Sequence, residues 1–536
     1  MSSHFRWYPS VDNEFTPWNA RYPFPTQASK ATKVTPRIVP KNGSDFTPGS
    51  VVRMEFPAQG YINPSNTFIS FDVVLDWGQS LPHDKGLDTQ TQLRIQNCIH
   101  SVFSRARLLY GAQPLEDIID SNVIIRALTE WTATQSDSLD QTTISEGIGG
   151  IKPVTLLTSV AGVPTQRTIN ENIRQWKIQG LTDVDPAVNG GRGCVPNNTV
   201  NTCSRRYMIQ LPFGLFNQGK MIPIKYMASQ LAVELTLASE AQCLFMKSGS
   251  ATPTRPTYTI KNMQLVPEIL EFDAMYDANI VRGLQEGIPI KFSSWHTYQF
   301  GVSNTSNINL LIQERSRSVK SIYALLRRTP QSIIFDSGSS LFIPLKNATL
   351  QNFQFRIGGR YYPAAPVECS TYVGGSQSNG GAEAFVELQK ALCTVGDYRL
   401  SSSVNTMRWA YPSIDCATTF SGSSVTFIED SQYGGTNELD YDWDACGFNA
   451  TSTLRVIDLN GTIANGVLGS QQFAMATSLE TSNGVEISGL NAEEQSDIAL
   501  RADYSQALPN GWGMYVYVYY DAMIVLEQNN VVRLIV

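Results

Sequence analysis

The 536-residue chain is poor in charge, in histidine and in long apolar runs, and each shortage excludes a class of function. Charged residues make up 16% of the sequence, whereas about 25% is usual in soluble domains. A surface this poor in charge predicts that neighbouring copies cover much of it. The four histidines lie far apart, and no cysteine or histidine pair has metal-ligand spacing. We therefore expect no bound cofactor, and His100, in an apolar context, is expected to be a core residue with its hydrogen bonds made.

The chain also lacks the features of secretion, of membrane insertion and of nucleic-acid binding. The first residues contain no apolar signal segment, and the most apolar run, residues 514–526, is too short for a membrane span and contains Asp521. The formal net charge is −7, and the basic residues are scattered, which argues against direct genome binding. The densest basic group lies in a strand-like region and comprises Arg315, Arg317, Lys320, Arg327 and Arg328.

Eight cysteines are widely spaced, and none forms a C-x-x-C pair. In a chain without a signal peptide, buried free thiols are the expected state. A Cys194–Cys203 disulfide is the alternative.

One segment resembles an enzyme motif. Residues 332–342 contain Asp336-Ser337-Gly338, which is similar to the active-site turn of pepsin-like aspartic proteases. Those enzymes need two carboxylates that share one proton, each on such a turn. The second turn is absent, so we interpret the segment as a strand entering a tight turn. No G-x-S-x-G, Walker A or dinucleotide-binding motif is present either, and we expect no catalytic residues.

An acidic cluster superficially suggests calcium binding. It comprises Glu438, Asp440, Asp442 and Asp444. An EF-hand loop starting at Asp440 would need glycine at Ala445 and glutamate at Thr451, so that motif fails. A looser structural calcium site near Asp440–Asp444 stays open, and no metal ligand is assigned.

Alternation of apolar and polar residues predicts a mostly β chain. Residues 69–75, 231–237, 353–357 and 514–519 each alternate with a period of two, as a strand with one face on a core requires. Helices are expected to be few and inserted in loops. The candidates are residues 115–131, with Glu116 and Asp117 in the first turn, residues 382–392, and residues 492–501 after Asn491.

Residues 1–48 differ from the rest of the chain. Prolines at this density favour extended structure, yet the aromatic residues between them are unusual for a disordered tail. We interpret the segment as an extended N-terminal arm that docks on another surface, with Trp7 and Trp18 as the docking candidates. The alternative is that it packs along its own domain.

A weak internal repeat indicates two copies of one β domain. The pattern S-V-x-S-x-x-x-L-L occurs at residues 101–109 and again at residues 318–326, and Phe272-Asp273-Ala274-Met275 resembles Tyr520-Asp521-Ala522-Met523. The predicted domains are therefore the arm at 1–48, a first domain at 49–286 and a second at 287–536. Two such β domains fit two consecutive jelly-roll barrels, a double jelly roll.

Several segments resemble a known family. Residues 48–57, PGSVVRMEFP, and residues 61–71, YINPSNTFISF, are similar to the opening of the double jelly-roll major capsid proteins of virophages and polinton-like viruses. Residues 101–120 and 511–526 resemble the same family. The resemblance implies trimers that act as pseudo-hexameric capsomers and tile the icosahedral shell of a double-stranded DNA virus. It also implies assembly in the host cell, location in the virion capsid, penton and minor capsid proteins as partners, and no enzyme activity.

Closed three-fold contacts fit this function, because three two-barrel chains present six similar barrels. The expected outward loops are residues 189–203 and 372–381. The alternative is a receptor- or glycan-binding β-sandwich surface protein, which would share the β content but would not need the duplicated layout.

Overall fold

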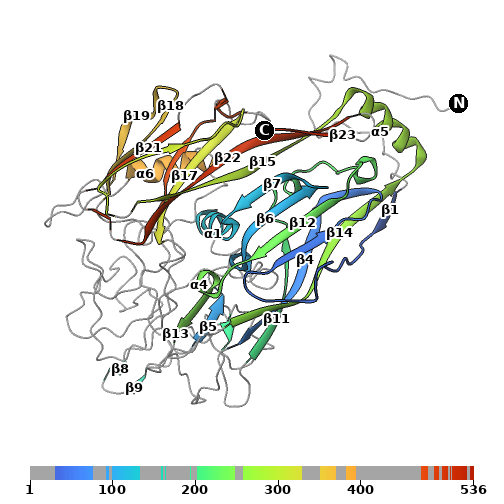
Figure 1. The fold of residues 1–536 in the computed structure, drawn as a ribbon, viewed down its shortest axis with the longest axis horizontal. Coiled ribbons are helices and arrows are strands. Elements are labelled where there is room, and N and C mark those ends of the chain that lie inside the picture. The colour runs from blue at the N-terminus through green and yellow to red at the C-terminus, as the bar shows by residue number, and fades with distance from the viewer. Residues whose placement is uncertain are drawn as a thin grey trace.

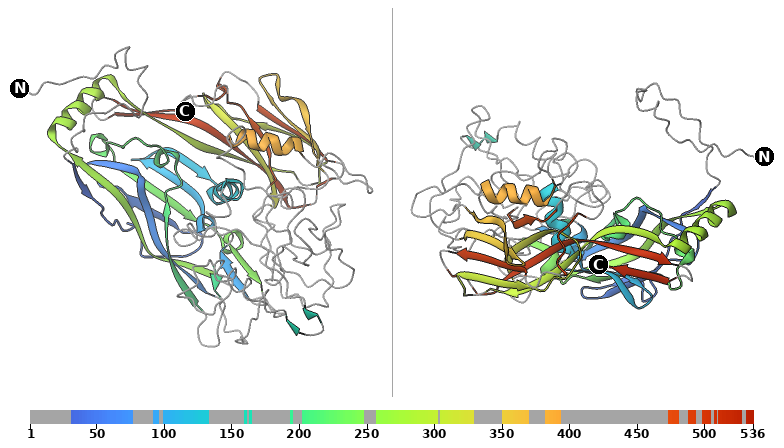
Figure 2. Two further views of the ribbon diagram at one scale, coloured as in Figure 1. Left: turned by 180° about the vertical axis from the view of Figure 1, so that it is seen from behind. Right: turned by 90° about the horizontal axis from the view of Figure 1, so that it is seen from above.

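The computed structural model describes residues 31–76, 92–95, 99–132, 159–160, 163–164, 193–194, 202–247, 257–302, 304–328, 350–369, 382–393, 473–480, 488–493, 498–504, 507–508, 510–527 and 531–536. Antiparallel sheets dominate it, as the alternation predicts. The sheets form two groups that lie side by side along the molecule (Figures 1 and 2).

The first group is an eight-position barrel built from two sheets. One sheet has the order β1-β14-β4-β11, with β2 also paired to β14, and the facing sheet has the order β3-β12-β6-β7. The strands are β1 (Ala31–Val34), β2 (Asp45–Phe46), β3 (Val51–Glu55), β4 (Tyr61–Asp76), β6 (Phe103–Tyr110), β7 (Gln113–Ile119), β11 (Thr202–Gln210), β12 (Leu231–Leu237) and β14 (Thr257–Phe272). A small sheet of β5 (Gln92–Ile95), β10 (Gly193–Cys194) and β13 (Leu244–Lys247) and a hairpin of β8 (Ser159–Val160) and β9 (Val163–Pro164) belong to connections of this half.

The second group repeats the arrangement. Its sheets have the orders β15-β22-β17-β20, with β23 paired to β22, and β16-β21-β18-β19. The strands are β15 (Ile288–Gly301), β16 (Asn307–Ile312), β17 (Val319–Arg328), β18 (Leu350–Ile357), β19 (Arg360–Glu368), β20 (Met475–Ser478), β21 (Ile498–Tyr504), β22 (Trp512–Glu527) and β23 (Val531–Ile535).

Both groups follow one connectivity. If the eight strand positions are counted along the chain, with β1 and β2 sharing the first, each barrel pairs them as 1-8-3-6 and 2-7-4-5. This is a jelly roll, so the duplication predicted from the sequence is confirmed. The short repeats that suggested it are not equivalent, however. Residues 101–109 lie at the fourth position, around β6, whereas residues 318–326 lie at the third, around β17.

The second short repeat fits only in part. Asp273 caps α5 after the end of β14, whereas Asp521 lies within β22, although the two strands hold the same position in their barrels.

Helices are few and sit in the connections. They are η3 (Ile99–Val102), α1 (Ser121–Thr132), η5 (Gly214–Phe216), η6 (Ile224–Tyr226), α4 (Glu240–Cys243), α5 (Ala274–Glu286) and α6 (Ala382–Ala391). The predicted helix at 382–392 is thus confirmed. The predicted helix at 115–131 is wrong in its first turn, because residues 113–119 form β7 and α1 begins only at Ser121.

The predicted helix at 492–501 is also wrong, since residues 498–504 form β21, which pairs with both β16 and β18. The helix α5 was not predicted. Asp273 caps it by accepting a hydrogen bond from the Tyr276 amide, and Gly287 ends it at a φ of 85°.

The described part of the N-terminal segment is extended, as predicted, and packs along its own barrel. Strands β1 and β2 pair with β14, and Ile38 bridges to Leu265. This agrees with the alternative stated for the arm, at least for residues 31–48.

Candidate functional site: the joint between the two barrels

One strand of the second barrel, β15, reaches past its own sandwich and packs on the first barrel. β15 and β22 pair along 14 residues, from Ile288 opposite Leu526 to Gly301 opposite Gly513. β15 then contacts β7 and η5 of the first barrel, and Figure 1 shows the long strands β15 and β22 side by side next to β7. The chain crosses from one barrel to the other through α5. These elements form the joint.

A buried carboxylate lies at the centre of the joint. Glu116 of β7 is 1% exposed, and it accepts hydrogen bonds from the amides of Gly214 and Leu215 at 2.9 Å each and from the Ser294 hydroxyl at 2.7 Å. The three donors come from η5 of the first barrel and β15 of the second. Burial raises the pKa of Glu116 to about 7, although the three hydrogen bonds oppose the shift.

A buried ion pair lies beside it. Arg327 of β17 donates to Asp120 at 2.8 Å, and its side chain is fully buried. Asp120 follows β7 with a φ of 52° and also accepts from Gln299 of β15. The guanidinium lies 3.6 Å from the ring centre of Tyr515, a cation–π contact. A buried pair of this kind favours one relative position of the barrels, because removal of either partner leaves an unpaired charge.

The backbones of the two barrels approach closely at Gly214. A Cβ atom at this position would lie 1.7 Å from the Ser293 carbonyl oxygen. Only glycine fits there. Near it, the Thr297 hydroxyl donates to the Ile119 carbonyl at 2.8 Å. The joint is therefore backbone against backbone, with polar side chains that link the two barrels.

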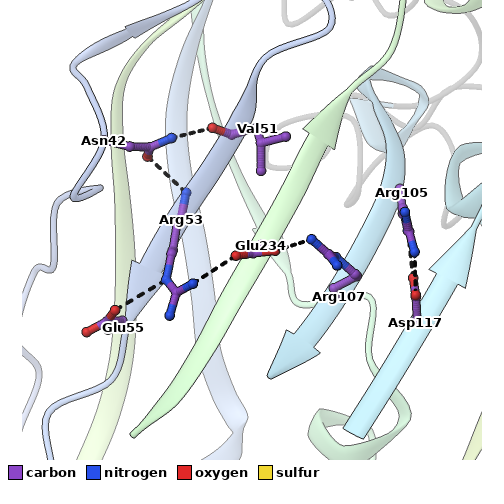
Figure 3. Close-up of polar contacts among 8 residues, drawn as sticks. All are labelled: Asn42, Val51, Arg53, Glu55, Arg105, Arg107, Asp117 and Glu234. Atoms are coloured by element: carbon purple, nitrogen blue, oxygen red, sulfur yellow. Dashed lines mark hydrogen bonds and ion pairs between the residues drawn. The ribbon is translucent and has the colours of Figure 1, made fainter. Parts of the chain in front are cut away.

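A second polar feature covers the outer face of the β3-β12-β6-β7 sheet (Figure 3). Arg53, Glu234, Arg107 and Asp117 stand directly opposite one another on the four strands, in that order. Glu234 accepts from Arg53 at 3.0 Å and from Arg107 at 2.5 Å, and Arg105 donates to Asp117 at 2.7 Å. We call Arg53, Glu234, Arg107 and Asp117 the charged row.

Most residues selected from the sequence lie outside the described residues. This holds for Trp7 and Trp18, for Asp336-Ser337-Gly338, for the Asp440–Asp444 cluster and for loop 372–381. Loop 189–203 includes β10 and the first residues of β11, and the rest of it lies outside the description. The Cys194–Cys203 alternative stays a prediction. Cys243 and Cys369 are buried thiols, as expected, whereas the Cys393 thiol is exposed.

His100 is buried as predicted, but its hydrogen bonds are incomplete. Burial lowers its pKa to about 4, and within the described part of the chain Nδ1 has no hydrogen-bond partner. Three of the five residues in the densest basic group are ion-paired within the chain, namely Arg317 with Glu493, Lys320 with Glu480 and Arg327 with Asp120.

Among the described residues, no cluster of three or more histidine, cysteine or acidic side chains is placed to hold a metal ion. Within the same residues, no helix is long and apolar enough to cross a membrane.

Two jelly rolls in series, held by one joint, define a double jelly-roll protein. No protein-family model and no curated protein matches the chain. Solved viral structures do. A chain of the Sputnik virophage, solved by cryo-EM, is 11% identical with a TM-score of 0.52, over 98% of this chain and 92% of that chain.

Two other viral chains are also similar. The mavirus major capsid protein is 8% identical with a TM-score of 0.49, over 97% of this chain and 94% of that chain. The Faustovirus major capsid protein is 11% identical with a TM-score of 0.46, over 96% of this chain and 94% of that chain. The likeness to the Sputnik virophage chain, with its TM-score of 0.52, confirms at the level of the fold the resemblance found in the sequence.

Proposed function

We propose that this chain is a major capsid protein whose trimers are pseudo-hexameric capsomers of an icosahedral virus shell. The observation that carries the proposal is one connectivity used twice in a single chain, with both copies fixed by a buried joint. Three copies around a three-fold axis then present six similar barrels, and a six-sided block tiles a surface without gaps.

The joint gives this proposal a physical basis. A capsomer needs a constant angle between the two barrels of each chain, because every error in that angle is repeated in all three chains of the trimer. The buried groups at Glu116, Asp120 and Arg327 favour one angle, since sliding the barrels would leave donors or charges unpaired. The similarity to a chain of the Sputnik virophage over nearly the whole length supports the same function.

Each part of the chain then has its own role in the capsomer. Residues 49–286 and 287–536 are the two barrel domains, and residues 31–48 add the edge strands β1 and β2 to the first. Residues 1–30, with Trp7 and Trp18, are the part of the predicted arm left for docking on a neighbour. Penton and minor capsid proteins are the other partners, the virion capsid is the location, and the chain acts without catalysis.

The test is the mass of the purified full-length protein in solution, measured by light scattering during size exclusion. The chain mass of 59.2 kDa predicts a trimer at 3 × 59.2 = 177.6 kDa, with larger particles at high concentration. Electron micrographs of that peak should show six-sided particles. A stable, folded monomer at every concentration would overturn the proposal.

A further inference from the structure

The charged row alternates in sign across the whole sheet. Read from β3 to β7, its side chains are positive, negative, positive and negative. Such a row is complementary to its own reverse. If a second copy faces the sheet after a half-turn about an axis parallel to the strands, Arg53 meets Asp117 of the second copy and Glu234 meets Arg107.

The orientation of the axis decides the sign of the interaction. A half-turn about an axis parallel to the row would place each residue opposite itself, so that like charges would meet. A half-turn about the strand direction reverses the row and makes every facing pair attractive. Opposite charges across an interface select partner and register in this way.

A second row on the same face obeys the same rule. Val51, Thr236, Arg105 and Ile119 stand opposite one another on the same four strands, two residues away from the charged row. The half-turn brings Val51 onto Ile119 and Thr236 onto Arg105. Val51 and Ile119 are 41% and 39% exposed, so these two partly exposed aliphatic side chains would bury each other in the contact.

The charged side chains keep enough exposure to take part. Arg53, Arg107 and Asp117 are 39%, 35% and 31% exposed, whereas Glu234 is 11% exposed between its two arginines. The terminal residues of the row, Arg53 and Asp117, are therefore the side chains that a second copy can reach best. Aligned packing of two sheets, at an angle of about 30°, suits two such faces.

We propose that this face is a two-fold contact between copies of this chain, with the half-turn axis parallel to the strands between β12 and β6. It deepens the proposed function, because it joins chains of neighbouring capsomers, whereas the capsomer itself is three-fold. Four strands about 4.8 Å apart and five residues deep give a face of only roughly 300 Å², below the roughly 800 Å² per partner of stable complexes. The contact is weak alone and acts in a shell through many repeats.

The test uses two single charge reversals and their mixture. Arg53→Glu places like charges opposite each other twice in every facing pair of copies, and so does Asp117→Arg. Each purified variant should associate at least about tenfold more weakly than the wild type in sedimentation velocity at low salt. An equimolar mixture of the two should recover the association, since the new glutamate at position 53 then faces the new arginine at position 117, and the unchanged ends face each other.

The matched control is Arg206→Glu. Arg206 pairs with Asp72 at 2.7 Å on the other sheet of the same barrel and carries the same charge change. It should leave the association unchanged. If single reversals weaken association but their mixture does not restore it, the face meets something other than its own reverse and the proposal is wrong.

A cross-linking experiment keeps the proposal testable if the charge variants fold poorly. A Cys393→Ser background removes one exposed thiol. In this background, Val51→Cys mixed with Ile119→Cys should give a disulfide between chains, identified by mass spectrometry of the 51–119 peptide pair. Val51→Cys mixed with Met208→Cys is the control, because Met208 is 39% exposed but lies on the other sheet. Equal yields in both mixtures would overturn the contact.

Failure of the two-fold contact can be distinguished from failure of the proposed capsomer. If the three-fold capsomer does not exist, the same face should still give a concentration-dependent dimer at 2 × 59.2 = 118.4 kDa. If trimers form but the mixture shows no recovery, only the two-fold contact fails.

Discussion

The two barrels share their connectivity but not their outer surfaces. The β3-β12-β6-β7 sheet and the β16-β21-β18-β19 sheet hold the same four positions, 2-7-4-5. The first carries the charged row. At the matching place in the second, one row reads Asn309, Arg501 and Gln354, and the next reads Leu311, Ala499, Arg356 and Tyr361.

The second face does not alternate in charge, and its exposed residues include Leu311 and Tyr361, both 50% exposed. Topology follows from burying one face of every sheet, so it survives duplication. The outer residues are free of that constraint and can specialise. Six barrels of a trimer would therefore look alike in outline while offering two alternating kinds of contact.

The joint is where the two barrels depend most on each other, and Arg327→Met should break it. Asp120 would then be buried without its cation, so we expect a loss of about 3–5 kcal/mol in the free energy of unfolding. Chemical denaturation followed by fluorescence measures it. Arg501→Met, whose side chain is 68% exposed beside Asp503, is the control and should cost below about 1 kcal/mol. Equal losses would show that the buried pair does not hold the joint.

Gly214→Ala should separate the two barrels by a different route. The added Cβ would lie 1.7 Å from the Ser293 carbonyl oxygen, so η5 and β15 must move apart, at a cost of about 3 kcal/mol. Gly219→Ala is the matched control, because nothing lies within 4 Å of its Cβ position. Thermal unfolding of both variants gives the comparison, and a Gly214→Ala protein as stable as Gly219→Ala would contradict the close approach.

The pH dependence of stability should reveal the carboxylate in the joint. The pKa of Glu116 is raised from 4.5 to about 7, so the folded state holds its proton more tightly than the unfolded state. Its contribution to the free energy of unfolding is full below about pH 4.5 and is lost as the pH rises through about 7, by about 3 kcal/mol.

Glu116→Gln should remove this part of the dependence of the unfolding free energy on pH. The measurement is the difference between the unfolding free energies of wild type and variant at each pH. Taking the difference removes the contribution of His100, which is the same in both proteins. Burial lowers the pKa of His100 to about 4, so its contribution to stability rises with pH, opposite to that of Glu116. Parallel curves for the two proteins would mean that Glu116 keeps an ordinary pKa.

The smallest effect should come from the charged row within one chain. Arg107→Gln leaves Glu234 paired with Arg53, so we expect a loss below about 1 kcal/mol, and less again at about 1 M salt. Denaturant titrations at low and high salt measure it. A loss as large as that of Arg327→Met would mean that the charged row stabilises the barrel itself. Its charges would then be explained by stability within one chain, without a contact between chains.

The sequence predicts the strands well because the barrel cores impose a period of two. The alternating runs at 69–75, 231–237 and 353–357 lie in β4, β12 and β18. The boundary that the sequence predicts at Gly287 coincides with the point where α5 ends, at a glycine of positive φ, and β15 begins.

One error arises in a strand whose burial does not alternate strictly. In β7, Leu115, Glu116 and Ile118 are all buried, because β7 is the edge strand of its sheet and β15 also packs against it. The spacing of these residues then fits a helix as well as a strand. Nothing local marks Glu116 as a joint residue, because its three donors lie about 100 and 180 positions away.

The pairing of first and last strands has a consequence for synthesis on the ribosome. The first barrel can close once β14 has emerged, at residue 272, because β14 is the last strand it needs. The second opens with β15 but cannot close until β22 arrives more than 200 residues later. For that interval the exposed edge of β15 is a hazard for misassociation between nascent chains. The folded first barrel presents β7 and η5, against which β15 can pack before β22 is synthesised. The joint would then also protect β15 during folding.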